Sequence, residues 1–216
     1  MATFAISDIH GRIDELKNLL SYINYSQSDN LIFLGDYIDR GPNSNAVIEA
    51  LIELSSNKPN VHFLKGNHEE MAIMSKVNSD TRKLWMKCGG EETLKSYPKG
   101  IPNHHWSFIY KFKKYIETDD SIFVHAGLEE KIDMDMQTNE SLLWTRLSSP
   151  IEHVSGKKIY CGHTSQKTGF PSLLGSARCI ECYGWLTAIE TDSDHVYQVN
   201  GIGDLRDFKI NDNPHV

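Results

Sequence analysis

Short apolar runs alternate with stretches of helical periodicity through the first third of the chain. Apolar runs at Thr3–Ile6, 31–34 and 61–64 predict three β-strands. Between them, residues 13–23 and 47–54 carry apolar side chains at helical spacing, which predicts two amphipathic helices. Strands that alternate with helices in this order are typical of repeated βαβ units, so this part of the pattern predicts an α/β fold.

The rest of the chain changes from a helical pattern to a strand-rich one. Residues 71–112 are expected to be mostly helical, with a break at Gly89-Gly90. Short strands are then predicted near residues 122–124, 158–160, 186–189 and 196–199. Because no linker or internal repeat divides the sequence, we expect a single domain over 1–216. Residues 129–140 include five acidic residues and one lysine, and we expect them to form a solvated loop.

Composition limits the class of protein and its partners. Hydrophobic residues make up 39% of the chain and charged residues 24%, which is typical of a globular protein with a core. Lysine and arginine number 22 against 29 aspartate and glutamate residues, so no overall basic field is present to attract nucleic acid or an anionic membrane. No apolar run approaches the roughly 20 residues of a membrane helix. The N-terminus also lacks the pattern of a secretory signal, and we therefore expect a cytoplasmic protein.

Five blocks of polar residues and glycine follow predicted strands. They are Asp8-Ile9-His10-Gly11, Gly35-Asp36-Tyr37-Ile38-Asp39-Arg40-Gly41, Gly66-Asn67-His68-Glu69, His125-Ala126-Gly127 and Gly162-His163-Thr164. Ligands of open α/β sheets bind beyond the carboxyl ends of the strands, so we expect these blocks to converge in space. Taken alone, Asp8 is better explained as the N-cap of the helix over 13–23, but five such blocks together favour a shared site.

The order and spacing of these blocks resemble a known family. The G-D-x-x-D-R-G block at 35–41, followed by G-N-H-E at 66–69, is similar to the phosphoprotein phosphatase branch of the calcineurin-like metallophosphoesterases. Within that branch the chain resembles the compact bacterial and phage-type serine/threonine protein phosphatases, over nearly its whole length. The resemblance implies an α/β fold in which two mixed β-sheets pack as a sandwich, flanked by helices, with the site at the strand ends.

The resemblance also implies that the site binds two divalent metal ions and that one residue is a ligand to both. The implied ligands are Asp8, His10, Asp36, Asn67, His125 and His163, of which Asp36 would bridge both ions. Carboxylate, imidazole and amide donors without a thiolate suit manganese, iron or zinc, and manganese is the first choice. Two ions about 3.5 to 4 Å apart can clamp both sides of an in-line displacement and lower the pKa of a bridging water, so that hydroxide exists at neutral pH.

Four further residues match positions that handle the phosphate group. Arg40 and Arg146 would grip the phosphate oxygens, because arginine presents paired donors to them. His68 would be the general acid that protonates the leaving group, with Asp39 as its carboxylate partner. Together these residues would form a local site for a phosphate dianion on an acidic protein.

The function implied by the resemblance is hydrolysis of phosphoserine and phosphothreonine in proteins or peptides, with phosphotyrosine also compatible. One alternative is a symmetrical diadenosine tetraphosphate hydrolase, a related group with the same metal site. Those enzymes typically carry N-R-G and G-N-H-D, whereas this chain has Asp39-Arg40-Gly41 and His68-Glu69. A remote alternative is a non-catalytic binding module with this fold, although such proteins usually lose ligands.

Some residues depart from the family pattern or lie outside it. The family commonly carries I-D-T-G near the C-terminus, where this chain has Ile180-Glu181-Cys182-Tyr183, so one loop beside the site is expected to differ. Cys179 and Cys182 form one C-x-x-C pair that we interpret as packed thiols, with oxidation of Cys182 as a secondary hypothesis. Among the histidines outside the blocks, the tandem His104-His105 is the one that merits a test.

Overall fold

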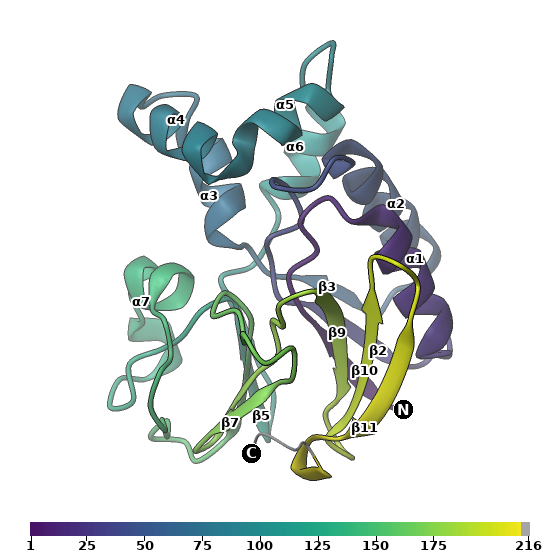
Figure 1. The fold of residues 1–216 in the computed structure, drawn as a ribbon. Helices are drawn as coiled ribbons and strands as arrows, with labels where there is room; N and C mark the ends of the chain where they lie inside the picture. The colour runs from purple at the N-terminus through teal and green to yellow at the C-terminus, as the bar shows by residue number, and fades with distance from the viewer. Residues whose placement is uncertain (213–216) are drawn as a thin grey trace.

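Eleven β-strands in residues 1–212, the part of the chain that the computed structural model describes, form two sheets (Figure 1). The six-stranded sheet has the order β11-β10-β9-β1-β2-β3, and the five-stranded sheet has the order β4-β5-β6-β8-β7. The strands of the first sheet are β1 (Thr3–Ile6), β2 (Asn30–Phe33), β3 (Val61–Phe63), β9 (Trp185–Glu190), β10 (His195–Asn200) and β11 (Leu205–Lys209). Those of the second are β4 (Tyr115–Glu117), β5 (Ser121–Val124), β6 (Lys158–Cys161), β7 (Ser172–Leu174) and β8 (Ala177–Cys179).

Both sheets are mixed. In the first, β1 pairs in parallel with β2, and β2 with β3, whereas β9, β10 and β11 add antiparallel strands. In the second, β5, β6 and β8 are parallel, and β4 and β7 are antiparallel edge strands. The predicted fold class, two mixed sheets packed as a sandwich with flanking helices, is therefore confirmed.

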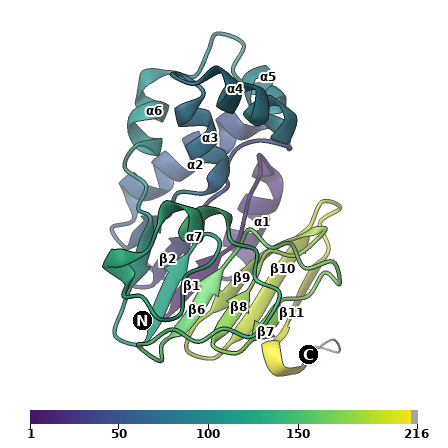
Figure 2. The same ribbon diagram turned by 90° about the vertical axis from the view of Figure 1, so that its left-hand side faces the viewer.

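Helices cover the outer faces of both sheets and extend beyond one end of the sandwich. They are α1 (Ile13–Tyr22), α2 (Ser44–Asn57), α3 (Asn67–Met74), α4 (Ser79–Trp85), α5 (Glu91–Ser96), α6 (Asn103–Ile109) and α7 (Asn139–Trp144). Figures 1 and 2 show α1 and α2 beside the six-stranded sheet, α7 beside the five-stranded sheet, and α4 to α6 grouped at one end of the molecule. None of the helices in residues 1–212 combines the length and apolar character that crossing a membrane requires.

Three apolar clusters hold these layers together. The inter-sheet cluster includes Ala5 and Leu34 from the first sheet and its β2 loop, packed with Phe123 and Tyr160 from the second. A second cluster lies between the six-stranded sheet and α1 and α2, and a third lies between the five-stranded sheet and α7. Since burying apolar surface is the main favourable term in folding, these clusters fix the relative position of the two rows of strand ends.

Most predicted elements are confirmed, and most of the differences fall on short ones. The helical region breaks at Gly89, whose φ of 113° interrupts the turn from α4 to α5. The sequence pattern missed β4, β7, β8 and α7, because three-residue strands and a six-residue helix are too short to show a period. It also missed the five-residue edge strand β11. Residues 129–140 are not loop throughout: Met134–Met136 form a 3₁₀ turn with Met134 buried, and α7 begins at Asn139. The single domain over 1–216 stays a prediction, and its last four residues lie outside the described part.

Candidate functional site

The predicted ligand residues meet at the carboxyl ends of strands from both sheets. Each follows a strand directly or within a few residues, and all of them are buried: Asp8 and His10 after β1, Asp36 after β2, Asn67 after β3, His125 after β5 and His163 after β6. The helix-cap alternative for Asp8 does not hold, because the residue before α1 is Arg12. The sequence therefore brings these six residues together as predicted, while their roles as ligands stay predictions.

Each of the three histidines has one ring nitrogen paired with a backbone carbonyl. The pairs are His10 Nδ1 with Ile38 O at 2.9 Å, His125 Nδ1 with Leu34 O at 3.0 Å, and His163 Nε2 with Trp144 O at 3.2 Å. Because a carbonyl can only accept, the paired nitrogen carries the hydrogen and the other nitrogen keeps its lone pair. Metal-binding histidines are oriented in this way.

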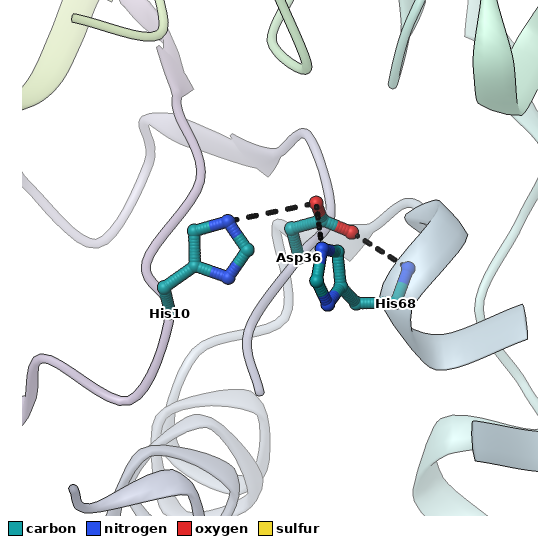
Figure 3. A group of neighbouring side chains, drawn as sticks. All are labelled: His10, Asp36 and His68. Carbon is teal, nitrogen blue, oxygen red and sulfur yellow. Dashed lines mark hydrogen bonds and ion pairs between the residues drawn. The ribbon is translucent and has the colours of Figure 1, made fainter. Parts of the chain in front are cut away.

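Asp36 lies between two groups of donor atoms. Figure 3 shows His10 and His68 on either side of its carboxylate, with their Nε2 atoms 3.7 and 3.8 Å from Oδ2. In the second group, which faces the other carboxylate oxygen, His125 Nε2 lies 3.5 Å from Asp36 Oδ1 and 2.9 Å from Asn67 Oδ1. His163 Nδ1 lies 3.1 Å from the same Asn67 oxygen. One carboxylate that faces both groups is suited to bridging two ions.

The protonation states fit divalent cations. Burial lowers the pKa of His10 to about 3 and that of His163 to about 4, so both are neutral, which is the form that ligates metal. Burial also raises the pKa of Asp8 well above its usual range, and the charges of Glu181 and Asp36 raise it further. Carboxyl groups that repel one another in a buried space are stabilised by cations, and carboxylate, imidazole and amide donors are those that manganese, iron and zinc accept.

Two glycines let the backbone approach the carboxylates closely. A Cβ on Gly66 would lie 2.0 Å from Asp36 Oδ1, and a Cβ on Gly162 would lie 2.0 Å from Asp8 Oδ1. Any side chain at either position would therefore displace a carboxylate. This contact explains why glycine precedes Asn67 and His163 in their blocks.

Backbone strain is concentrated at the same place. Seven non-glycine residues within 1–212 have positive φ, and five of them belong to the blocks: His10, Asp36, Asp39, Arg40 and His163. Such conformations cost about 1 to 3 kcal/mol each and persist only where the surroundings enforce them. Part of that enforcement comes from Glu69, whose carboxylate accepts N–H groups from Asp36 and Tyr37 at 2.9 Å and from Gly66 at 3.0 Å.

His68 and Asp39 form a buried pair beside the ligand group. His68 Nδ1 donates to Asp39 Oδ2 at 2.6 Å, and its Nε2 is turned toward Asp36. Asp39 also accepts from Trp85 Nε1 at 2.8 Å and from Thr93 Oγ1 at 2.6 Å, so its position is fixed from three sides. Burial alone would lower the pKa of His68, but the Asp36 charge and the Asp39 hydrogen bond outweigh it and the net shift is upward.

The two predicted phosphate-binding arginines stand at the exposed rim of the site. Arg40 Nη1 lies 2.9 Å from His10 Nε2, and its Nη2 lies 3.0 Å from His68 Nε2. Arg146 donates to the His163 carbonyl at 3.2 Å. A hollow of about 340 Å³ opens beside Arg40, and one of about 500 Å³ opens beside Arg146. Both guanidinium groups can therefore reach a ligand that enters from solvent.

Sequence reasoning missed one acidic residue at the site. Glu181 is buried and brings a carboxylate oxygen within 4.8 Å of ligand atoms of Asp8 and His10. It belongs to the segment that departs from the family pattern, and it lies two residues after β8, a strand too short for the sequence pattern to reveal. The neighbouring Cys182 is buried, and burial raises its pKa to about 12, which disfavours the reactive thiolate that the oxidation hypothesis needs.

Comparisons with known proteins agree with this geometry. Residues 1–209 match the sequence model of the calcineurin-like phosphoesterase family. Over 128 residues the chain is 31% identical to a PP2A-like serine/threonine-protein phosphatase of Saccharomyces cerevisiae, which covers 59% of this chain and 33% of that protein. It is 30% identical over 151 residues to the symmetrical bis(5'-nucleosyl)-tetraphosphatase of Wigglesworthia glossinidia brevipalpis, which covers 69% of this chain and 53% of that protein.

A solved structure shows the same fold at lower identity. The cold-active protein-tyrosine phosphatase of a psychrophilic Shewanella species superposes with a TM-score of 0.65 at 16% identity, over 95% of this chain and 80% of that one. The matched segments span only about a third to a half of the two sequence relatives. The likeness to the solved structure shows that the fold is shared.

Proposed function

Because the chain belongs to the calcineurin-like phosphoesterase family, we propose that it is a metal-dependent phosphomonoesterase that hydrolyses phosphoserine and phosphothreonine in proteins. The observation that carries the proposal is the set of three histidines whose paired nitrogens face backbone carbonyls while the others converge on Asp36 and Asn67. A protein that used this fold only as a scaffold would have no need of buried, mutually repelling carboxyl groups. Manganese as the metal and a cytoplasmic location stay predictions.

The chain's own residues would hold the ions and the substrate in place. Asp8, His10 and Asp36 would hold the first ion, and Asp36, Asn67, His125 and His163 the second. When bound, such ions supply Lewis acidity and a water of lowered pKa. Arg40 is already within hydrogen-bond reach of His10 and His68, so its guanidinium can turn outward to a phosphate oxygen with little movement.

The leaving group needs a proton, and in this proposal His68 supplies it. Hydrolysis breaks the bond between phosphorus and the serine or threonine oxygen, and water supplies the new phosphate oxygen. The departing oxygen takes the proton from His68 Nε2, while Asp39 holds Nδ1–H and stabilises the positive ring until the transfer. An alkyl oxygen is a poor leaving group, so this step matters more for phosphothreonine than for an aryl phosphate.

A second candidate function is hydrolysis of diadenosine tetraphosphate. It is supported by the match to the symmetrical bis(5'-nucleosyl)-tetraphosphatase, which covers 69% of this chain. The two candidates share the metal chemistry and differ in what the rim must accommodate. The phosphatase is preferred because the Asp39-Arg40-Gly41 and His68-Glu69 blocks match that group.

The two candidates are separated by one experiment. Metal-stripped protein is reloaded with manganese and offered a phosphothreonine peptide and diadenosine tetraphosphate in parallel, and both phosphate and nucleotide products are followed. Faster release of phosphate from the peptide supports the proposal. Faster cleavage of the dinucleotide to adenosine diphosphate keeps the metal chemistry and overturns the substrate assignment, and no turnover of either with any divalent ion favours the scaffold.

A further inference from the structure

We propose that Glu49, His104 and His105 form a second metal site, between α2 and α6, which takes a divalent transition-metal ion such as zinc. The site shares no residue with the phosphoesterase centre and does not depend on the proposed function. Glu49 lies on α2 and the two histidines lie near the start of α6, so the ligands come from helices that pack against each other. It also gives a role to the tandem histidines that lie outside the five blocks.

The three ligand atoms are already close to the spacing that zinc needs. His105 Nε2 lies 2.8 Å and His104 Nε2 lies 3.6 Å from the same oxygen, Glu49 Oε2. All three residues offer a ligand atom within 4.8 Å of the others. Zinc–ligand bonds of about 2.0 to 2.2 Å in a tetrahedron place neighbouring ligand atoms about 3.3 Å apart. Small rotations of side chains therefore suffice to bring the three into one coordination sphere.

The exposure of each ligand side chain suits this adjustment. The side chain of His105 is only 4% exposed and is fixed, whereas those of His104 and Glu49 are each 63% exposed and can turn toward an ion. The rings of the two histidines meet edge to face with centroids 4.4 Å apart. One rigid ligand and two adjustable ones leave a fourth position open to water, as in three-ligand zinc sites.

A hydrogen bond with Tyr97 orients the buried ligand His105. Tyr97 Oη lies 2.8 Å from His105 Nδ1, on the side of the ring opposite Glu49. Because a phenol hydroxyl can accept as well as donate, Tyr97 can take the Nδ1–H and leave the Nε2 lone pair for an ion.

The surroundings give an ion access from solvent. A hollow of about 390 Å³ opens at the three residues and is also lined by Asn45, Tyr97 and Lys99. Lys99 is the one cation in this lining, and its exposed side chain is free to extend into water. Two imidazoles in the donor set favour zinc, copper or nickel over magnesium and calcium, which prefer oxygen ligands.

The test compares zinc binding by the full-length protein and three variants. His104→Ala removes an exposed ligand, and Glu49→Gln removes the carboxylate charge. His195→Ala is the control, because it removes a half-buried imidazole that faces a single carboxylate, Asp207. Each protein is loaded with manganese, equilibrated with zinc by dialysis and analysed for bound metal. Thermal melts with and without zinc, and with magnesium in its place, give a second readout.

The expected result is that wild type and His195→Ala bind one zinc ion per chain more than His104→Ala and Glu49→Gln. Zinc should raise the melting temperature of wild type beyond its effect on His104→Ala, whereas magnesium should not distinguish the two. His104→Ala should melt like wild type without zinc, which shows that it is folded. Equal zinc content in wild type and His104→Ala would overturn the proposal, and so would equal content in wild type and Glu49→Gln.

Discussion

Replacing Asp39 by asparagine tests whether the buried pair with His68 serves proton transfer. The substitution preserves shape and can preserve the hydrogen bonds. The amide oxygen can accept from His68 and Trp85, and the amide nitrogen can donate to Thr93, whose hydroxyl turns to accept. What is lost is the negative charge, so the variant separates charge from structure.

The size of the effect follows from the hydrogen bond that is weakened. A bond between an imidazolium and a carboxylate contributes about 1.5 to 3 kcal/mol, and the neutral bond that replaces it is roughly half as strong. The difference of about 0.75 to 1.5 kcal/mol corresponds to roughly a 4- to 13-fold loss of kcat, since each 1.36 kcal/mol is a factor of 10. Removing the acid altogether, as in His68→Asn, should cost about 10² to 10⁴-fold.

The pH profile gives the sign of the effect. The pKa of His68 is raised in the folded protein despite its burial, and the acid form acts below that pKa. Activity should therefore fall as pH rises through the raised value, and in Asp39→Asn this fall should move to lower pH. The assay measures kcat against pH for phosphothreonine peptide and for p-nitrophenyl phosphate, whose good leaving group needs less help from an acid.

A double-mutant cycle supplies the decisive comparison. If Asp39 acts only through His68, adding Asp39→Asn to His68→Asn should cost nothing more on the peptide. Trp85→Phe is the matched control, because it removes another donor to Asp39 without changing the charge. An unchanged alkaline limb in Asp39→Asn, or an equal loss on both substrates, would refute the reasoning.

Three further outcomes are expected. Chelation should lower the melting temperature, because an ion that binds only the folded chain adds about 1.4 kcal/mol for each tenfold excess over its Kd, and identical melts with and without chelator would argue against a metal centre. Glu181→Gln should weaken metal binding in equilibrium dialysis, since it removes a carboxylate beside Asp8 and His10, whereas tighter binding would mean that Glu181 only repels Asp8. Hydrogen bonds from Ser26 lower the pKa of Asp29 to about 2. The ionised carboxylate therefore stabilises the fold above the unfolded pKa of about 3.9, and this stabilisation is lost as pH falls through about 2. Urea melts of Asp29→Ala should therefore show a loss of stability at neutral pH that shrinks toward pH 2, and a constant loss would contradict the assignment.

The sequence predicted more of the candidate site than of the fold. Runs of three or four apolar residues mark β1, β2 and β5 as strands, and the polar residues after them were expected to share one edge of the structure. The two-sheet arrangement was predicted only from the family resemblance, because the alternation of strands and helices predicts no more than an α/β fold. Edge strands such as β4 and β7 were missed, since three residues with no buried position among them show no period.

Other parts of the site leave no mark on side-chain patterns. The carbonyl groups of Leu34, Ile38 and Trp144 orient the ligand histidines, and every residue has a carbonyl, so sequence cannot single them out. Positive φ angles are uncommon outside glycine, even though histidine and aspartate adopt them more often than most residue types, so the sequence does not single out His10 and Asp36 as having them. Both features arise from tertiary packing rather than from the segments themselves.

Because the candidate metal centre lies between the two sheets, bound ions would affect the structure of the protein as well as its chemistry. Asp36 follows β2 of the six-stranded sheet, and His125 follows β5 of the five-stranded sheet, yet their ligand atoms are 3.5 Å apart. An ion held by both would join the two sheets at one end of the sandwich, whereas without an ion the same place combines strained backbone with repelling carboxyl groups. Metal loss should therefore loosen the contact between the sheets first, ahead of the apolar clusters under α1 and α7, and hydrogen exchange should rise earliest at the carboxyl ends of β1, β2, β5 and β6.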